Sequence, residues 1–254
     1  MGCRLALGVS SLALGLAATA ALADGVPTAG RVATYSGCGY GSFAGAYIGA
    51  ALGYGRQHGK FTNQAPVVGG NSLSNDDGSA TFGGYGGYNW QCGRAVLGVE
   101  ADFNYLNTEP TAYDDTVTVQ SNIDWFGTVR ARAGIAIHDS VLLYATGGLA
   151  YANVDHTFSD TAGPSGPFSQ SNSKTQSGWT IGGGAEFLHD SNWTLRAEAL
   201  WVDLGDKTVN YSIPGGGCPS GICQAQVNYD DDFWVARIGL SYKFGEREPV
   251  VPLK

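Results

Sequence analysis

The tripeptide His-Asp-Ser occurs twice, at residues 138–140 and 189–191, and holds the three residue types of a hydrolytic triad. A serine hydrolase aligns its nucleophile, base and orienting acid through hydrogen bonds, and three adjacent residues in a tight turn cannot form that line. Asp and Ser are also ordinary turn residues. We therefore interpret both tripeptides as turns, and their recurrence suggests a repeated hairpin unit.

Two further patterns resemble catalytic or binding motifs. Residues 39–44 formally fit the dinucleotide pattern G-x-G-x-x-A, but no strand is expected before them and no helix after them, so that site is excluded. Glu100 and Glu198 have the residue type of a catalytic carboxylate pair. Arginines lie close to both in the expected strands, so a structural ion network is favoured, and the sequence predicts a protein that is not an enzyme.

Composition and charge exclude other classes. Residues 1–23 have a basic start, an apolar run and the small-x-small end of a signal peptide, so the mature chain would begin at Asp24. The formal net charge is −8, with 22 acidic and 14 basic residues, which argues against a nucleic-acid partner. After the signal peptide no run of 18 apolar residues remains, which excludes a helical membrane span.

Alternation with a period of two runs through most of the mature chain and predicts strands. No window shows the spacing of an amphipathic helix. Eight candidate strands of about ten residues are expected, five with clear alternation and three diluted by glycine: 47–54, 97–105, 125–135, 194–201 and 234–244, with 81–90, 141–151 and 178–187.

The connections between these strands alternate in length. Short ones lie at 91–94, 138–140 and 189–192, and long ones, rich in Gly, Asn, Asp, Ser and Thr, lie near 55–79, 107–122, 154–176 and 205–230. This pattern is typical of an all-β, eight-stranded, antiparallel up-and-down transmembrane β-barrel with tight turns at one rim and loops at the other.

The two faces of the expected strands differ in chemistry. One face is apolar and aromatic, and the other carries four acids and four arginines: Glu100, Asp102, Glu186, Glu198, Arg130, Arg132, Arg196 and Arg237. Charge facing lipid would be costly, so these side chains are expected to pair inside a narrow lumen. Aromatic residues at the strand ends fit the girdles that mark both edges of a membrane.

Several blocks resemble one family. Tyr47-Ile48-Gly49, Gly87–Gln91, Leu97–Asp102, Asp124–Arg130 and Tyr144–Tyr151 are similar to the small alphaproteobacterial outer-membrane proteins of the brucellar and rhizobial surface-protein type, as is Trp201–Gly205. The resemblance spans about 43–244. It implies an OmpA-like eight-stranded barrel in the bacterial outer membrane, a role in envelope integrity or surface interaction, and no catalytic residues.

The resemblance also divides the chain. Residues 43–244 form the expected barrel, residues 24–42 a periplasmic segment, and residues 245–254 a periplasmic tail. Strand 234–244 resembles the signal that the barrel-insertion machinery reads, with Tyr242 and Phe244 as its aromatic residues. Here that signal would be internal, because ten residues follow Phe244.

Four cysteines remain in the mature chain, and topology chooses between their three pairings. Cys218 and Cys223 share the last long loop, while Cys38 and Cys92 lie near the turn rim. Since the membrane separates the two rims, the pairs Cys38–Cys92 and Cys218–Cys223 are expected, and a zinc site is not.

The long loops carry acidic runs at 76–77, 114–115 and 230–232, which are expected to be solvated. A sharper hypothesis is that they hold divalent cations beside lipopolysaccharide phosphates, because such ions prefer carboxylate oxygens. No metal ligand set or cofactor is otherwise indicated.

The sequence therefore predicts a monomeric structural or surface-interaction protein, in contact with outer-membrane lipid and lipopolysaccharide, with a lumen filled by side chains. The alternative is a small porin-like channel with two more strands hidden in segments such as 116–120 or 227–229.

Overall fold

A computed structural model describes residues 38, 41–63, 72–114, 117–161, 167–189, 192–214 and 222–244. The chain divides into a unit Met1–Thr34, none of whose residues is described, and a unit Tyr35–Lys254, which holds the sheet. The expected signal peptide, Cys218 of the expected Cys218–Cys223 pair and the tail lie outside the described residues, as does most of segment 24–42. No helix among the described residues is long and apolar enough to cross a membrane.

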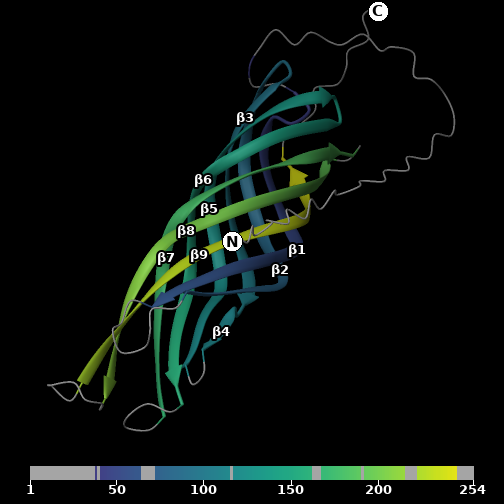
Figure 1. Ribbon diagram of the computed structural model, residues 1–254. Coiled ribbons are helices and arrows are strands. Elements are labelled where there is room, and N and C mark those ends of the chain that lie inside the picture. Colours follow the sequence, from purple (N-terminus) through teal and green to yellow (C-terminus); the bar gives the residue numbers. More distant parts are fainter. Residues whose placement is uncertain are drawn as a thin grey trace, which may run out of the picture. The chain divides into compact units, whose positions relative to one another are not determined.

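All nine strands belong to one antiparallel sheet (Figure 1). They are β1 (Gly45–Asn63), β2 (Ser72–Cys92), β3 (Ala95–Thr108), β4 (Thr111–Asp114), β5 (Val117–His138), β6 (Val141–Asp160), β7 (Phe168–Leu188), β8 (Trp193–Pro214) and β9 (Ile222–Lys243).

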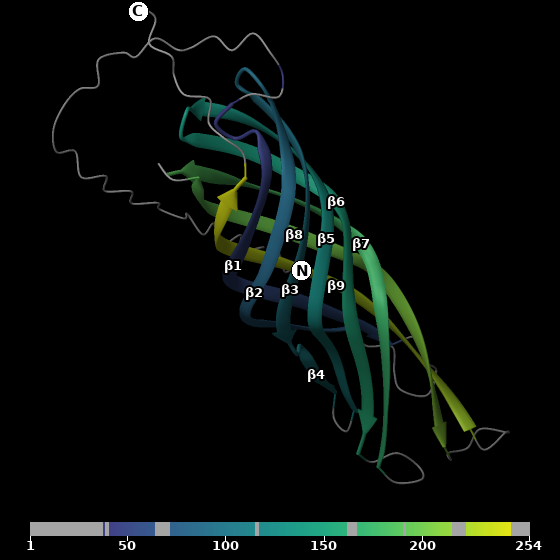
Figure 2. The ribbon, with the colours of Figure 1, turned by 180° about the vertical axis from the view of Figure 1, so that it is seen from behind.

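Eight of these strands close into a ring. The sheet order runs β3-β2-β1-β9-β8-β7-β6-β5, and β3 also pairs with β5, from Ala95↔Ile135 to Thr108↔Ile123. Closure gives each of the eight strands a neighbour on both sides, so the ring has no free edge. Figures 1 and 2 show these tilted strands from opposite sides, with the short β4 beyond the end of β3.

The strands are longer than the sequence predicts. Apart from β4 and the 14-residue β3, they have 19 to 22 residues, so most of the expected long loops are continuations of strands. The segments 117–120 and 227–229 belong to β5 and β9 and add no strand to the ring. The residues 230–232, expected in a loop, also lie within β9.

The strands continue well beyond the aromatic residues that mark the loop rim. We call the strand segments beyond these aromatic residues the loop-side extension. The aromatic residues that define the loop rim are Tyr54, Tyr105, Trp125, Tyr151, Trp179, Trp201 and Trp234. On β9 the extension runs from Asp232 back to Ile222, about 35 Å along the strand at the usual rise per residue. Strand β1 keeps its register with β2 and β9 into the extension, whereas the β5–β6 register shifts between Ile123 and Trp125 and the β8–β9 register shifts between Asp203 and Asp206.

Candidate functional site

The outer face of the ring is a continuous apolar band. Leu52 and Phe82 are 62% and 63% exposed, and the outward residues between the two aromatic rims of the described strands carry no charge. Aromatic pairs mark the rims, such as Trp179–Trp201 at the loop rim and Trp193–Tyr242 at the turn rim. An exposed apolar surface of this extent suits lipid better than water.

The inner face brings together all eight charged residues that the sequence predicts for the lumen. Strand register places three pairs directly opposite each other: Glu100↔Arg130, Glu186↔Arg196 and Glu198↔Arg237. Asp102 and Arg132 stand one inward position away on β3 and β5. We call these eight side chains the ionic layer; all of them are buried, and their formal charges sum to zero.

Arg130 lies at the centre of the ionic layer. Its guanidinium contacts three carboxylates: Glu100, Asp102 at 2.9 Å and Glu198 at 3.2 Å. Because the fork of a guanidinium suits several carboxylate oxygens at once, one arginine here joins β5 to β3 and β8.

The other arginines complete the ring of contacts. Arg196 lies 2.6 Å from Glu100 and 2.7 Å from Glu186, and Arg237 lies 2.7 Å from Asp102 and 2.9 Å from Glu198. Each carboxylate of the layer therefore contacts at least two arginines. Such a network compensates for the cost of burial, which a lone charge could not do.

Three inward tyrosines pack against the arginines. Tyr47 donates a hydrogen bond to Glu100 at 2.7 Å, and Tyr144 donates one to Glu198 at 3.2 Å. The guanidinium of Arg196 lies 4.1 Å from the ring centre of Tyr85, within range of a cation–π contact. The tyrosines thus fill the space between the charged groups.

Inward glycines make room for these rings, which accounts for some of the 39 glycines among the 254 residues of the chain. A Cβ at Gly239 would lie 2.8 Å from the Tyr85 hydroxyl, and one at Gly184 would lie 2.8 Å from the Tyr144 hydroxyl. Either contact is shorter than packed carbon and oxygen atoms allow. The sequence alone shows the glycines but not which tyrosine each one accommodates.

We expect Gly239→Ala to lower the free energy of unfolding by about 1 to 3 kcal/mol, because the added methyl group overpacks the lumen and displaces Tyr85 from Arg196. Urea unfolding of the refolded protein in lipid vesicles measures this. Gly93→Ala is the control for a glycine with open space around its Cβ, although its positive φ of 59° adds a small backbone cost of its own. Equal stability of Gly239→Ala and wild type would contradict the packing role.

A second buried polar group lies in the loop-side extension, and the sequence does not predict it. Asp231 is fully buried and accepts a hydrogen bond from the Ser121 hydroxyl at 2.8 Å, while His156 Nε2 lies 2.9 Å from its other oxygen. Gln57 contacts the same carboxylate at 3.3 Å. We call these four residues the Asp231 cluster.

The Asp231 cluster corrects the expectation that residues 230–232 are solvated. Asp231 points inward because it lies at an even spacing from the inward Phe233 and Tyr229 on β9. The sequence does contain a signal for a buried polar group here. His156 is one of only four histidines, and on β6 it lies between the apolar inward residues Val154 and Phe158 at a spacing of two.

The Asp231 cluster contains Ser, His and Asp but lacks triad geometry. Ser121 and His156 both bond to Asp231, whereas a triad needs the serine on the histidine and the histidine on the acid. All three residues are buried, which leaves a substrate no access to Ser121. The cluster is arranged to satisfy buried polar groups.

The inward residues form layers along the whole lumen. On β9 the inward sequence from the turn rim is Lys243, Ser241, Gly239, Arg237, Val235, Phe233, Asp231, Tyr229 and Val227. Apolar clusters thus separate the polar layers: one with Phe43 and Leu142 near the turn rim, one with Phe126 and Phe233 next to the ionic layer, and one with Phe158 and Tyr229 in the extension. Buried side chains thus line the lumen from the turn rim into the extension.

The described acidic residues on the outer face show no metal-binding group made of protein side chains alone. Among the residues that the structure describes, no group of three or more His, Cys, Asp or Glu side chains is placed to hold a metal ion. Asp76 pairs with Arg56 at 2.9 Å and also contacts His58, and Asp77 accepts a hydrogen bond from the backbone of Glu109. The contacts of Asp76 and Asp77 therefore join neighbouring strand segments of the protein.

Asp230 lies on the outer face beyond the loop rim, close to other acids. Partial burial, with Asp206, Asp232 and Asp203 nearby, raises the pKa of the Asp230 carboxyl above its usual value. A carboxyl whose pKa is raised by folding makes the folded state less stable when it ionises.

We therefore expect Asp230→Asn to stabilise the protein at pH 7, and the gain to fade as the pH falls through the raised pKa and wild-type Asp230 takes up its proton. Thermal unfolding at pH 7 and pH 3 measures the effect, with the exposed turn variant Asp139→Asn as control. A variant less stable than wild type at pH 7 would mean that the attraction of Lys60 dominates.

The turn rim carries the expected disulfide. Cys38 and Cys92 are joined, and their backbones also form an isolated β-bridge. The bond ties the segment before β1 to the turn between β2 and β3. At the next turn along the chain, the Ser140 backbone N–H donates to His138 Nδ1 at 3.2 Å, as expected for turn chemistry.

Comparisons with known proteins agree with this architecture. A family model described as outer membrane protein beta-barrel domain matches residues 9–244. The chain is 34% identical over 256 residues to the 31 kDa outer-membrane immunogenic protein of Brucella melitensis, covering 93% of this chain and 98% of that protein. It is 31% identical over 206 residues to the 22 kDa outer membrane protein of Rhizobium leguminosarum bv. viciae, covering 80% and 79%.

A solved structure supports the fold alone. The outer membrane protein OprG from Pseudomonas aeruginosa aligns with a TM-score of 0.57 at 15% identity, over 81% of this chain and 99% of that chain. Taken together, the closed ring, its apolar outer band and these matches show that the chain belongs to the outer membrane protein beta-barrel domain family and is a protein of the bacterial outer membrane.

Proposed function

We propose that this protein is a structural and surface-interaction protein of the outer membrane, that its barrel is closed to solutes, and that it is not an enzyme. The observation that carries the proposal is the layered lumen, in which the ionic layer lies between apolar clusters. A pore would need a continuous water-filled path, and an eight-stranded ring is just wide enough for side chains to fill.

Conductance separates the closed barrel from a small porin-like channel. We expect the refolded protein in planar lipid bilayers to give no steady single-channel steps across a voltage ramp. Arg130→Ala removes a side chain from the centre of the lumen and serves as a comparison. If this variant conducts and the wild type does not, the wild-type side chains close the lumen. Steady steps from the wild-type protein would overturn the proposal and favour passive diffusion of small solutes.

The loop-side extension supports a role at the cell surface. It presents strand faces to solvent well beyond the loop rim, while the apolar cluster around Phe158 and Tyr229 keeps its interior packed. A rigid sheet positions binding groups better than a flexible loop does. We place outer-membrane lipid and lipopolysaccharide against the apolar band and expect the protein to be a monomer.

The last strand suits recognition by the barrel-insertion machinery. Tyr242 and Phe244 lie at the turn rim, where their rings pack 5.4 Å apart, and the Phe244 backbone N–H bonds to Ala46 on β1. Replacing both rings by alanine is expected to reduce the amount of protein reaching the outer membrane. If the variant reached the outer membrane in the same amount as the wild type, Tyr242 and Phe244 would not be needed for recognition by the insertion machinery.

A further inference from the structure

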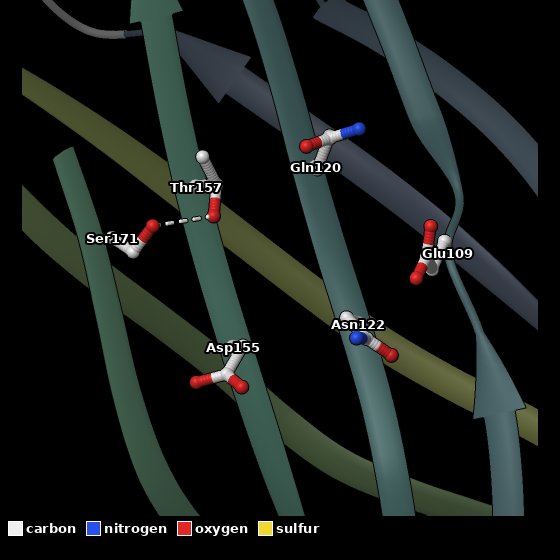
Figure 3. Close-up of a pocket in the computed structure, with 6 residues that line it drawn as sticks. All are labelled: Glu109, Gln120, Asn122, Asp155, Thr157 and Ser171. Carbon is white, nitrogen blue, oxygen red and sulfur yellow. Dashed lines mark hydrogen bonds between the residues drawn. The ribbon is translucent and has the colours of Figure 1, made fainter. Parts of the chain in front are cut away.

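A polar pocket lies on the outer face of the loop-side extension, away from the lumen (Figure 3). Its volume is about 280 Å³. Six residues from the β4 side, β5, β6 and β7 line it: Glu109, Gln120, Asn122, Asp155, Thr157 and Ser171.

Strand register builds this pocket. On β5 the inward residues are Val119, Ser121 and Ile123, so Gln120 and Asn122 point outward. Register then aligns Gln120 with Thr157 and Thr157 with Ser171, and places Asn122 opposite Asp155. Gln120, Thr157 and Ser171 lie side by side on β5, β6 and β7, and Glu109 lies on the other side of β5. The lining residues therefore span about three strand spacings, roughly 14 Å.

Several polar atoms in the pocket lack partners within the described part of the chain. The structure shows no hydrogen bond or ion pair from a described residue to the side-chain carboxylates of Glu109 and Asp155, which both line the pocket. The Asn122 Oδ1 atom also accepts no hydrogen bond from these residues, but it is buried and out of reach of a ligand. Thr157 and Ser171 bond to each other at 2.9 Å, as Figure 3 shows. Carboxylate oxygens accept hydrogen bonds, so a ligand that donates hydrogen bonds can pair with the carboxylates of Glu109 and Asp155.

We propose that this pocket binds a neutral saccharide of two or three sugar units. Sugar hydroxyls both donate and accept hydrogen bonds. They can donate to the carboxylates of Glu109 and Asp155 and accept from the amide groups of Gln120 and Asn122. The two carboxylates, with no basic residue in the lining, disfavour phosphorylated or sulfated ligands.

The size of the pocket favours a saccharide over a metal ion. A calcium ion needs oxygen ligands within 2.3 to 2.6 Å of one point, which is far tighter than the spread of these six residues. A lysine ammonium offers donors only, so it would satisfy the carboxylates but not the amide N–H groups.

An aromatic ring lies on the same outer face. Tyr113 on β4 points outward and is 72% exposed, two residues from Thr111, which accepts a hydrogen bond from Gln120. An exposed ring in this position can cover the C–H face of a sugar. Tyr113 does not line the pocket itself but lies opposite Thr118, two residues along β5 from the lining residue Gln120.

This proposal rests on the surface-interaction role proposed above, but its test does not depend on conductance. The folded protein in detergent micelles is titrated with lactose, maltose and cellobiose, and saturation-transfer NMR reports binding. We expect at least one disaccharide to bind with a dissociation constant in the millimolar range. The double variant Glu109→Gln/Asp155→Asn is expected to weaken that binding at least tenfold, and Tyr113→Ala to weaken it less.

The matched control is Asp206→Asn, which removes an exposed outer-face carboxylate on β8 and is expected to bind sugar like the wild type. Each variant is first checked for the heat-dependent gel shift of a folded barrel. The proposal is overturned if no disaccharide binds, if the double variant binds as well as the wild type, or if calcium chloride or trilysine, but no sugar, perturbs the pocket. A closed barrel without sugar binding would leave the proposed function standing and remove only this ligand.

Discussion

Arg130→Ala is expected to lower the free energy of unfolding by about 4 kcal/mol, which is the largest effect of any single substitution considered for this protein. The variant leaves Glu100, Asp102 and Glu198 in the lumen with one fewer cation, and removing one partner of a buried ion pair costs about 3 to 5 kcal/mol. Urea titration in lipid vesicles, read by the gel shift of the folded barrel, measures the change.

Two further arginine variants separate charge from geometry. Arg56→Ala removes an arginine whose side chain is 51% exposed and pairs with Asp76, so a loss below about 1 kcal/mol is expected. Arg130→Lys keeps the charge but loses the planar fork that contacts three carboxylates, so an intermediate loss is expected. A similar loss in Arg56→Ala and Arg130→Ala would show that the ionic layer contributes no more than a surface pair.

Asp231→Ala is expected to cost about 3 kcal/mol. The variant removes the acceptor that His156, Ser121 and Gln57 share, and each buried donor left without a partner costs about 1 to 3 kcal/mol. Thermal unfolding of the barrel and proteolysis of the extension both report the loss, since the cluster joins β1, β5, β6 and β9.

The neighbouring residue supplies the control. Asp232 lies on the opposite face of β9 and accepts a hydrogen bond from Trp201 Nε1 at 3.2 Å. Asp232→Ala is expected to change stability by less than about 1 kcal/mol, because its surroundings are partly solvated. If Asp231→Ala and Asp232→Ala were equally stable, the Asp231 cluster would not contribute to the free energy of unfolding.

The sequence predicts the ring but misjudges the length of its strands. Within the apolar band, alternation is strong because outward residues must suit lipid and inward residues must pack. Beyond the loop rim the inward residues are apolar and the outward ones polar, the reverse of the pattern in the apolar band: Val117 and Val119 point inward and Gln120 points outward. On β7 the residues 171–175 are exposed on both faces, so no alternation remains to mark a strand. Composition there resembles that of a loop.

The backbone explains the exposed stretch of β7. Pairing between β7 and β8 stops at Trp179↔Asp203, although β7 continues to Phe168 and β8 to Pro214. Strand β7 keeps its hydrogen bonds to β6 along its whole length, which holds it extended without an apolar face. A partner strand distant in sequence thus decides its conformation.

The sequence by itself determined the fold class, the outward apolar band, the eight charged residues of the lumen and the Cys38–Cys92 pair, because each follows from alternation within single strands and from which rim a turn occupies. Only the tertiary structure decided which charges meet around Arg130, that Asp231 turns inward to His156 and Ser121, and that Asn122 and Asp155 share a pocket. Those contacts join residues on different strands, and their register is set by closure of the whole ring rather than by any local pattern.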